Sequence, residues 1–286
     1  MSSSSNAEVG HSVSSRVDDT AADLLSWFDL SQQYVVALSG GVDSSVVAEA
    51  VSRSGATARL VTANSAAVSS VEISDVEKVC GQIDLPHEFL LTGELSVDGY
   101  TENGASRCYF CKSELFRQIT ARFPEAVILT GTNLDDLSDF RPGLKAAAEH
   151  SVRSPLAELK ISKRQVRELA NLWQLHVADK PASPCLASRI AHGVSVTRER
   201  LARIEAAEAT LRKLGLVDCR VRLHEGELAR IEVCPADFDL VCSKRDALAD
   251  EFIQLGFRYV TLDLQPLRSG SQNAVYGIQV NTRPER

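Results

Sequence analysis

The first residues whose types and spacing could do chemistry are Ser39-Gly40-Gly41-Val42-Asp43-Ser44, called the Gly-rich loop below. An apolar run, residues 34–38, precedes the loop, and a run of helical character, residues 45–51, follows it. A strand, a tight turn and a helix in this order aim backbone N–H groups and a helix N-terminus at an anion. The glycines let the backbone turn and approach a phosphate closely. The loop therefore predicts a phosphate site, although without the lysine of the loop that holds β- and γ-phosphates.

Three of the seven cysteines lie where metal or sulfur chemistry is plausible. Cys108 and Cys111 form a CxxC at the start of a predicted helix, and Cys185 lies in a Pro-rich loop beside Lys180 and Arg189, whose charges favour a thiolate. The CxxC alone is compatible with a redox pair, half a zinc site, part of an iron–sulfur site or chance. Three thiolates suit a cluster with one open coordination position, since a fully protein-ligated 4Fe-4S cluster takes four cysteines.

A third group of polar residues follows a predicted strand. Gly131-Thr132-Asn133 comes first, and the carboxylates of Asp135, Asp136 and Asp139 follow. Such oxygens could hold a magnesium ion together with nucleotide phosphates. An asparagine that caps a helix with acidic residues in its first turn explains the same pattern, so both interpretations stay open.

The elements that must position these groups alternate along the chain. Strands are expected at 34–38, 58–63, 88–91 and 126–130, with helices through 24–28, 45–51, 72–84 and 108–119 between them. This order predicts an α/β fold with a doubly wound parallel sheet, whose ligands bind at the carboxyl ends of the strands. Residues 138–159 look irregular, and 162–174 look helical. The remainder, with helices 197–214 and 243–255 and short strands 219–223, 229–234 and 258–264, predicts a small α+β domain. The expected division is a disordered leader at 1–17, a nucleotide-binding domain at 18–194 and a small domain at 195–286.

The composition of the chain argues against several classes of function. The chain has 286 residues, of which 44% are hydrophobic and 24% charged, with a net charge of −7. These values are typical of a globular protein and argue against a nucleic-acid partner, which usually requires a basic surface. No stretch is apolar enough for a membrane span, and the Ser-rich start is not a secretory signal, so the expected location is the cytoplasm.

The motifs together resemble a known family. SGGVDS resembles the pyrophosphate loop of the ATP pyrophosphatases. With RCYFCK, GTNLDDLSDFRPG, SPLAELKISK, DKPASPCLASRI and RSGSQN, the chain resembles the LarE-type sulfur transferases, which make the nickel-pincer nucleotide cofactor of lactate racemase. The resemblance implies that a carboxylate of pyridinium-3,5-biscarboxylic acid mononucleotide is adenylated with ATP and Mg²⁺, and that sulfur then displaces AMP to give a thiocarboxylate.

The resemblance implies two possible sulfur donors. In one mode a single cysteine, here Cys185, gives up its own sulfur once. In the other, that cysteine and a CxxC hold a 4Fe-4S cluster whose sulfide is transferred. The presence of Cys108 and Cys111 beside Cys185 predicts the second mode, with many turnovers.

The resemblance also implies roles for individual residues. The pyrophosphate and its metal would be held by Ser39, Gly40, Gly41, Asp43 and Ser44. The adenosine would lie beside Ala63, Asn64 and Ser65, and the nucleotide would be covered by Gly131, Thr132 and Asn133, with Asp136 as a magnesium ligand or orienting group. Arg189 would offset charge near the transferred sulfur.

The phosphate of the substrate is assigned to Arg220 and Arg222. Strand alternation puts both guanidiniums on one face, and arginine binds phosphate in a bidentate manner. Two solvated arginines on an exposed face are the structural alternative. The family pattern places Glu208 and Glu232 near the sulfur-transfer site, while Arg268 is open between a structural and a phosphate-binding role.

Other functions share parts of this pattern. A tRNA thiolase would share the loop and the cluster but need a basic surface, which the charge of −7 disfavours. An amide-forming synthetase would need no clustered cysteines, and a non-catalytic nucleotide-binding protein would keep only the fold. The resemblance further implies a homo-oligomer, expected to be a hexamer, with a small-molecule substrate and a sulfide source as its partners.

Overall fold

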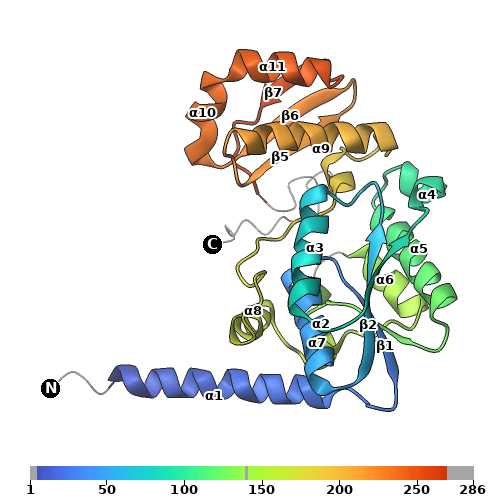
Figure 1. The fold of residues 1–286 in the computed structure, drawn as a ribbon. Helices are drawn as coiled ribbons and strands as arrows, with labels where there is room; N and C mark the ends of the chain where they lie inside the picture. The colour runs from blue at the N-terminus through green and yellow to red at the C-terminus, as the bar shows by residue number, and fades with distance from the viewer. Residues whose placement is uncertain (1–4, 139–140, 269–286) are drawn as a thin grey trace. The chain divides into compact units, whose positions relative to one another are not determined.

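The computed structural model describes residues 5–138 and 141–268 (Figure 1). Asp139 of the third polar group and the part of RSGSQN from residue 269 onward lie outside the described residues. Contacts divide the chain into two compact units. The first unit comprises Met1–Asn64, Ser70–Thr92 and Cys111–Pro181, and the second comprises Ser65–Ser69, Gly93–Phe110 and Ala182–Arg286.

The first unit is built on a parallel sheet, as the alternation of strands and helices predicts. The strand order is β3-β2-β1-β4, and neighbouring strands pair in parallel. The strands are β1 (Gln33–Ala37), β2 (Thr57–Asn64), β3 (His87–Leu91) and β4 (Val127–Leu129). Since all four run in one direction, the Gly-rich loop after β1, Asn64 at the end of β2 and Gly131 after β4 lie at the same edge of the sheet.

Helices cover both faces of this sheet. They are α1 (Ser5–Ser26), α2 (Val42–Ser54), α3 (Ser70–Gln82), α5 (Arg107–Arg122), α6 (Pro142–Glu149), α7 (Pro155–Glu158) and α8 (Lys163–Leu172). An apolar cluster joins α1, α2, α3 and α8 to one face, with Val36 of β1 and Leu60 of β2 among its members. Their strand neighbours Val35 and Val61 are equally buried but point to the opposite face, where α5 and α6 lie (Figure 1).

The second unit is an α+β structure, as expected for the C-terminal region. Strands β5 (Cys219–His224) and β6 (Leu228–Val233) form an antiparallel pair, and β7 (Tyr259–Leu262) pairs with β6 in parallel. The helices are α4 (Asp98–Thr101), α9 (Arg198–Lys213), α10 (Phe238–Ser243) and α11 (Arg245–Gln254). Short 3-10 turns are η1 (Glu94–Ser96), η2 (Asp135–Ser138), η3 (Leu186–Arg189) and η4 (Pro235–Asp237), of which η2 belongs to the first unit.

Three details differ from the sequence expectations. Helix α1 begins at Ser5, although a helix was expected only through residues 24–28; no proline stands in this stretch to end a helix. Residues 138–159 contain α6 and α7, each with a proline at its start, and helices this short give little periodic signal. The second unit includes residues from 182 onward and two earlier segments, whereas a single boundary near 194 was expected.

None of the helices in the described part of the chain is both long and apolar enough to cross a bilayer.

Candidate functional site

The Gly-rich loop forms the turn between β1 and the N-terminus of α2. Gly40 has a φ of 71°, and a Cβ there would lie 3.0 Å from the Val76 side chain, so only glycine fits without strain. The Ser44 hydroxyl accepts a hydrogen bond from the Ser39 N–H at 3.2 Å and donates to the Gly41 carbonyl at 3.1 Å. Gly41 is the N-cap of α2, and no side chain caps the helix there. The first N–H groups of α2 are therefore available to an anion.

The segment after β4 packs directly against this turn. A Cβ on Gly131 would lie 2.4 Å from the Ser44 nitrogen and 2.9 Å from the Asp43 Cβ, so a side chain at this position is excluded. Asn133 is almost fully buried, and its Nδ2 donates to Asp43 Oδ1 at 3.0 Å. Two motifs that are about ninety residues apart in sequence thus form one structure at the edge of the sheet.

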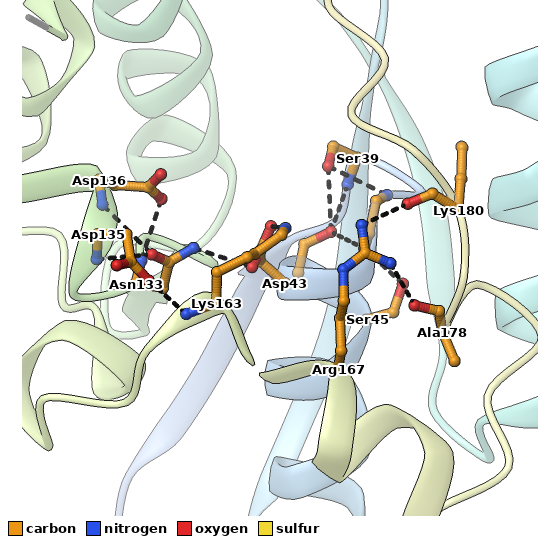
Figure 2. A network of polar contacts seen from close by, with 12 residues as sticks. Ser39, Asp43, Ser45, Asn133, Asp135, Asp136, Lys163, Arg167, Ala178 and Lys180 are labelled. Carbon is orange, nitrogen blue, oxygen red and sulfur yellow. Dashed lines mark hydrogen bonds and ion pairs between the residues drawn. The ribbon is translucent and has the colours of Figure 1, made fainter. Parts of the chain in front are cut away.

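Two lysines complete the network around the loop, and Figure 2 shows the first of them, Lys163, beside Asp43. The Lys163 Nζ, at the start of α8, lies 2.5 Å from Asp43 Oδ2. Lys180 Nζ donates to the Gly40 carbonyl at 2.8 Å and pairs with Asp75 Oδ2 at 2.8 Å. The tertiary structure therefore supplies, from distant segments, the cations that the Gly-rich loop lacks in sequence.

Asn133 caps the short turn η2, which carries the acidic residues. Asn133 Oδ1 accepts from the N–H groups of Asp135 and Asp136 at 2.9 and 3.2 Å, which is the capping geometry. Asp136 pairs with Arg141 at 2.7 Å, and burial raises the pKa of its carboxyl group although Arg141 opposes that shift. The capping interpretation of Asn133 is thus confirmed. Asp43 and Asp136 also place carboxylate oxygens near the Gly-rich loop. Among the described residues no three His, Cys, Asp or Glu side chains gather closely enough to hold a metal ion alone. These two carboxylates fit a magnesium ion that also takes phosphate oxygens.

The residues assigned to adenosine lie at the end of β2. Ala63 and Asn64 are partly exposed there, and Ser65 follows in the second unit. The Ser65 hydroxyl hydrogen-bonds to the buried carboxylate of Glu94. No sequence argument singled out Glu94.

The loop that carries Cys185, residues 184–190, is held by its carbonyl groups. The Cys185 carbonyl accepts from the Ser188 hydroxyl at 2.7 Å and from Arg189 Nη1 at 3.2 Å. Arg189 Nη1 also donates to the Pro184 carbonyl. The bonds use the backbone of Cys185, and the residue stays partly exposed.

Two buried ion pairs surround this loop in the second unit. Arg189 Nε donates to Glu208 Oε1 at 2.9 Å, and the same oxygen accepts the backbone N–H of Val221 in β5. Arg222 pairs with Glu232 at 2.9 Å and donates to the Ser188 carbonyl at 2.9 Å. Glu208 and Glu232 therefore lie beside the Cys185 loop, and each has a structural partner.

Arg220 is the exception in this group. It is 7% exposed, and its guanidinium donates to the Arg268 carbonyl at 3.1 Å. Within the described residues no carboxylate pairs with it. Burial, together with the charges of Arg222 and Arg189, lowers its pKa to about 10. Both strand arginines are buried rather than solvated, which excludes the exposed-face alternative and leaves a partly unneutralised cation.

The three candidate cysteines are all free thiols. Cys108 and Cys111 lie near the start of α5, where Cys108 is exposed and Cys111 partly exposed. Cys108 belongs to the second unit together with Cys185, and Cys111 belongs to the first. Three free thiols match the donors that iron–sulfur clusters use. The ammonium group of Lys180, which was expected beside Cys185, contacts Asp75 and the Gly40 carbonyl.

Sequence reasoning missed several polar residues of these regions. Lys163 stands in the quoted SPLAELKISK motif, but nothing in its spacing indicates that it reaches Asp43. Asn103 and Arg107 precede the CxxC and were not among the candidate residues, yet both are buried. A buried polar residue gives no periodic signal, so only contacts could identify them.

Comparisons with known proteins find relatives of this chain. The chain is 41% identical over 259 residues to an uncharacterized protein of Synechocystis sp., covering 88% of this chain and 96% of that protein. It is 34% identical over 249 residues to the pyridinium-3,5-bisthiocarboxylic acid mononucleotide synthase of Lactiplantibacillus plantarum, covering 85% and 89%. An uncharacterized protein of Methanocaldococcus jannaschii is 32% identical over 178 residues, covering 61% and 69%. No protein-family model matches the chain.

Proposed function

The chain belongs to the family of the LarE-type pyridinium-3,5-bisthiocarboxylic acid mononucleotide synthases, and on this premise we propose that it inserts sulfur into a nicotinate-like mononucleotide during synthesis of a nickel-pincer cofactor. The proposed substrate is pyridinium-3,5-biscarboxylic acid mononucleotide. One of its carboxylates attacks the α-phosphorus of ATP and pyrophosphate leaves. A sulfide then attacks the carbonyl carbon and AMP leaves, which gives the thiocarboxylate.

The first unit is suited to the adenylation step. The uncapped N-terminus of α2 would receive the pyrophosphate, and Lys163 would move from Asp43 to a phosphate oxygen when ATP and Mg²⁺ bind. Asp43 and Asp136 supply oxygen donors for magnesium. The chemistry here is positioning and neutralisation of charge, to which preorganised donors contribute most.

The second unit is suited to the phosphate of the mononucleotide and to the sulfur donor. The observation that carries the proposal is the buried arginine pair of β5. Arg222 is bonded to the Cys185 loop, while Arg220 pairs with no carboxylate among residues 5–138 and 141–268. A phosphate bound to Arg220 would place the substrate beside that loop. Arg189, fixed by Glu208, adds positive charge there.

We propose that Cys108, Cys111 and Cys185 hold a 4Fe-4S cluster: all three thiols are free, although they do not form a metal-binding group in the described structure without the cluster. When bound, the cluster would supply a sulfide at the iron that lacks a cysteine ligand. The residues of the chain would fix the Cys185 backbone through Ser188 and Arg189 and keep the acceptor carbonyl oriented through the arginine pair.

The decisive experiment is an anaerobic reaction of the reconstituted protein with ATP, magnesium, sulfide and the biscarboxylic mononucleotide. Thiocarboxylate is counted per chain by mass spectrometry. More than one equivalent is expected and supports the cluster mode. At most one equivalent, together with loss of sulfur mass at Cys185, would replace it with the sacrificial mode. Pyrophosphate release without any thiocarboxylate would contradict sulfur transfer itself.

A further inference from the structure

Two buried polar residues that the proposed function leaves unused hold the segment that follows Cys185. Asn103 is fully buried, with a φ of 57°. Its Nδ2 donates to the carbonyls of Ile190, Ala191 and Val194 at 3.2, 2.9 and 3.0 Å. Its own carbonyl accepts the Gly193 N–H at 3.2 Å. One side chain thus fixes the backbone over residues 190–194.

Arg107 extends this contact toward both cysteine segments. It is 7% exposed, and its Nη1 donates to Asn103 Oδ1 and to the Ala187 carbonyl, each at 2.7 Å. Its Nη2 lies 3.9 Å from Cys108 Sγ. Ala187 is two residues after Cys185. The guanidinium therefore spans from the backbone of the Cys185 loop to the first thiol of the CxxC.

Unlike an ordinary buried polar contact, this one joins the two segments that carry Cys108 and Cys185. A buried guanidinium is costly unless its hydrogen bonds are satisfied, and here they go to an amide oxygen, a loop carbonyl and a thiol. Asn103 lies four residues before Arg107, and Arg107 directly precedes Cys108. All the residues involved belong to the second unit, so the contact is internal to one compact body.

We propose that Asn103 and Arg107 are positioning residues that hold the Cys185 loop at a fixed place relative to Cys108. For sulfur transfer this role rests on the function proposed above. The role itself is a property of the chain without any ligand. It predicts that the loop is already ordered before a cluster or substrate binds.

Three substitutions test the proposal. Arg107→Met keeps an unbranched apolar stem and removes the donors, and Arg107→Lys keeps a charge and one donor group. Asn103→Ala removes the side-chain bonds to Ile190, Ala191 and Val194. Should that variant fail to fold, the two Arg107 variants decide the matter. Arg117→Met is the matched control, because Arg117 lies on the same helix with a side chain that is 61% exposed.

The first readout uses the ligand-free chain. Hydrogen exchange at the amides of Ala191, Gly193 and Val196, and the rate of Cys185 alkylation mapped by mass spectrometry, are expected to rise about tenfold in Arg107→Met, since charged hydrogen bonds are lost. Arg107→Lys is expected to lie between the two, and Arg117→Met to match the parent protein. Equal exchange and alkylation rates in Arg107→Met and the parent would overturn the proposal.

The second readout separates positioning from general stability. In Arg107→Met, iron bound per chain and thiocarboxylate per minute are expected to fall about tenfold, while the KM for ATP and the rate of pyrophosphate release stay at the parent values, and Arg107→Lys restores part of the loss. A parallel fall in pyrophosphate release would mean a merely structural role and overturn the proposal. If the parent protein makes no thiocarboxylate, the proposed function fails, but exchange and alkylation still decide whether the two residues hold the loop.

Discussion

The two polar regions of this protein handle charge in opposite ways. Around the Gly-rich loop of the first unit, the Lys163 and Asp43 side chains are 35% and 24% exposed. In the second unit, the Arg222 and Glu232 side chains are 4% and 2% exposed. The first region consists of backbone donors and a pair that water already reaches (Figure 2). The second holds the buried pairs Arg189–Glu208 and Arg222–Glu232, together with the incompletely paired Arg220.

This difference indicates what each region can do. A partly solvated pair exchanges one partner for a phosphate at little cost, which suits a nucleotide that binds and leaves. Each charged group of a buried pair has lost its hydration, and only the other group of the pair offsets this loss. The two groups therefore keep a fixed geometry. The second region therefore suits the orientation of a reacting group, and its incompletely paired Arg220 is where an anion would be gained.

The largest expected effect is on the stability of the second unit. Glu232→Gln removes the carboxylate that pairs with both Arg222 and Arg230 and leaves two guanidiniums without it. Breaking a buried pair in this way costs roughly 3–5 kcal/mol, measurable by urea unfolding. Glu168→Gln is the control, because its pair with Arg164 lies on an exposed helix face and contributes less than about 1 kcal/mol. If both variants lost a similar, small amount of unfolding free energy, the buried pairs of the second unit would not differ from exposed pairs in their contribution to stability.

In the first unit the loss is expected in activity instead. Lys163→Met should lower the rate of ATP-dependent pyrophosphate release about 10²- to 10³-fold, since one preorganised cation is lost from the developing charge. Stability should change by no more than about 1 kcal/mol because the pair is partly solvated. Lys145→Met, on the exposed side of α6, is the comparison variant. Unchanged pyrophosphate release would show that Lys163 serves only to hold Asp43.

Arg220→Met probes the incompletely paired cation. We expect the KM for the mononucleotide to rise about 10- to 100-fold, as for the loss of a charged hydrogen bond, with stability unchanged or increased because a buried charge is removed. Inorganic phosphate should raise the melting temperature of the parent protein by mass action and leave that of the variant unchanged. Arg245→Met, at an exposed arginine, should behave as the parent. Equal stabilisation of Arg220→Met by phosphate would place the anion elsewhere.

The smallest effect concerns pH. Burial, followed by the charges of Arg230 and Arg222, lowers the pKa of His224. In the unfolded chain the His224 imidazole is protonated below about pH 6.5, while in the folded chain it is protonated only at a lower pH. The free energy of unfolding therefore falls as the pH drops from about 7 to 5, by at most about 1.4 kcal/mol per pH unit.

His224→Gln should flatten this fall in a series of urea titrations. His87→Gln is the counterpart in the parallel sheet, where burial also lowers the pKa but the carboxylates of Glu88 and Glu77 oppose it. We expect the smaller change for His87→Gln. A larger change there would mean that burial, and not the guanidiniums, governs the acid response.

Much of the first unit could be predicted because its signals are local. The Gly-rich loop, the strand runs and the helix starts each lie within a few residues, and parallel order then brings three loop ends to one edge. Short helices such as α6 escaped prediction because eight residues show little periodicity. The arginine pair of β5 was expected on one face, but its burial was not predictable from alternation, because β5 is buried on both faces.

By itself, the sequence determined the α/β class, the turn that presents the N-terminus of α2, and the segments that could carry sulfur chemistry. Each of these follows from backbone preferences over a few neighbouring residues. The tertiary structure alone decided that Lys163 pairs with Asp43, that Arg222 holds the Cys185 loop, and that Asn103 and Arg107 hold the residues after it. These contacts join segments far apart in the chain, and the energy of each depends on how completely folding removes its charges from water.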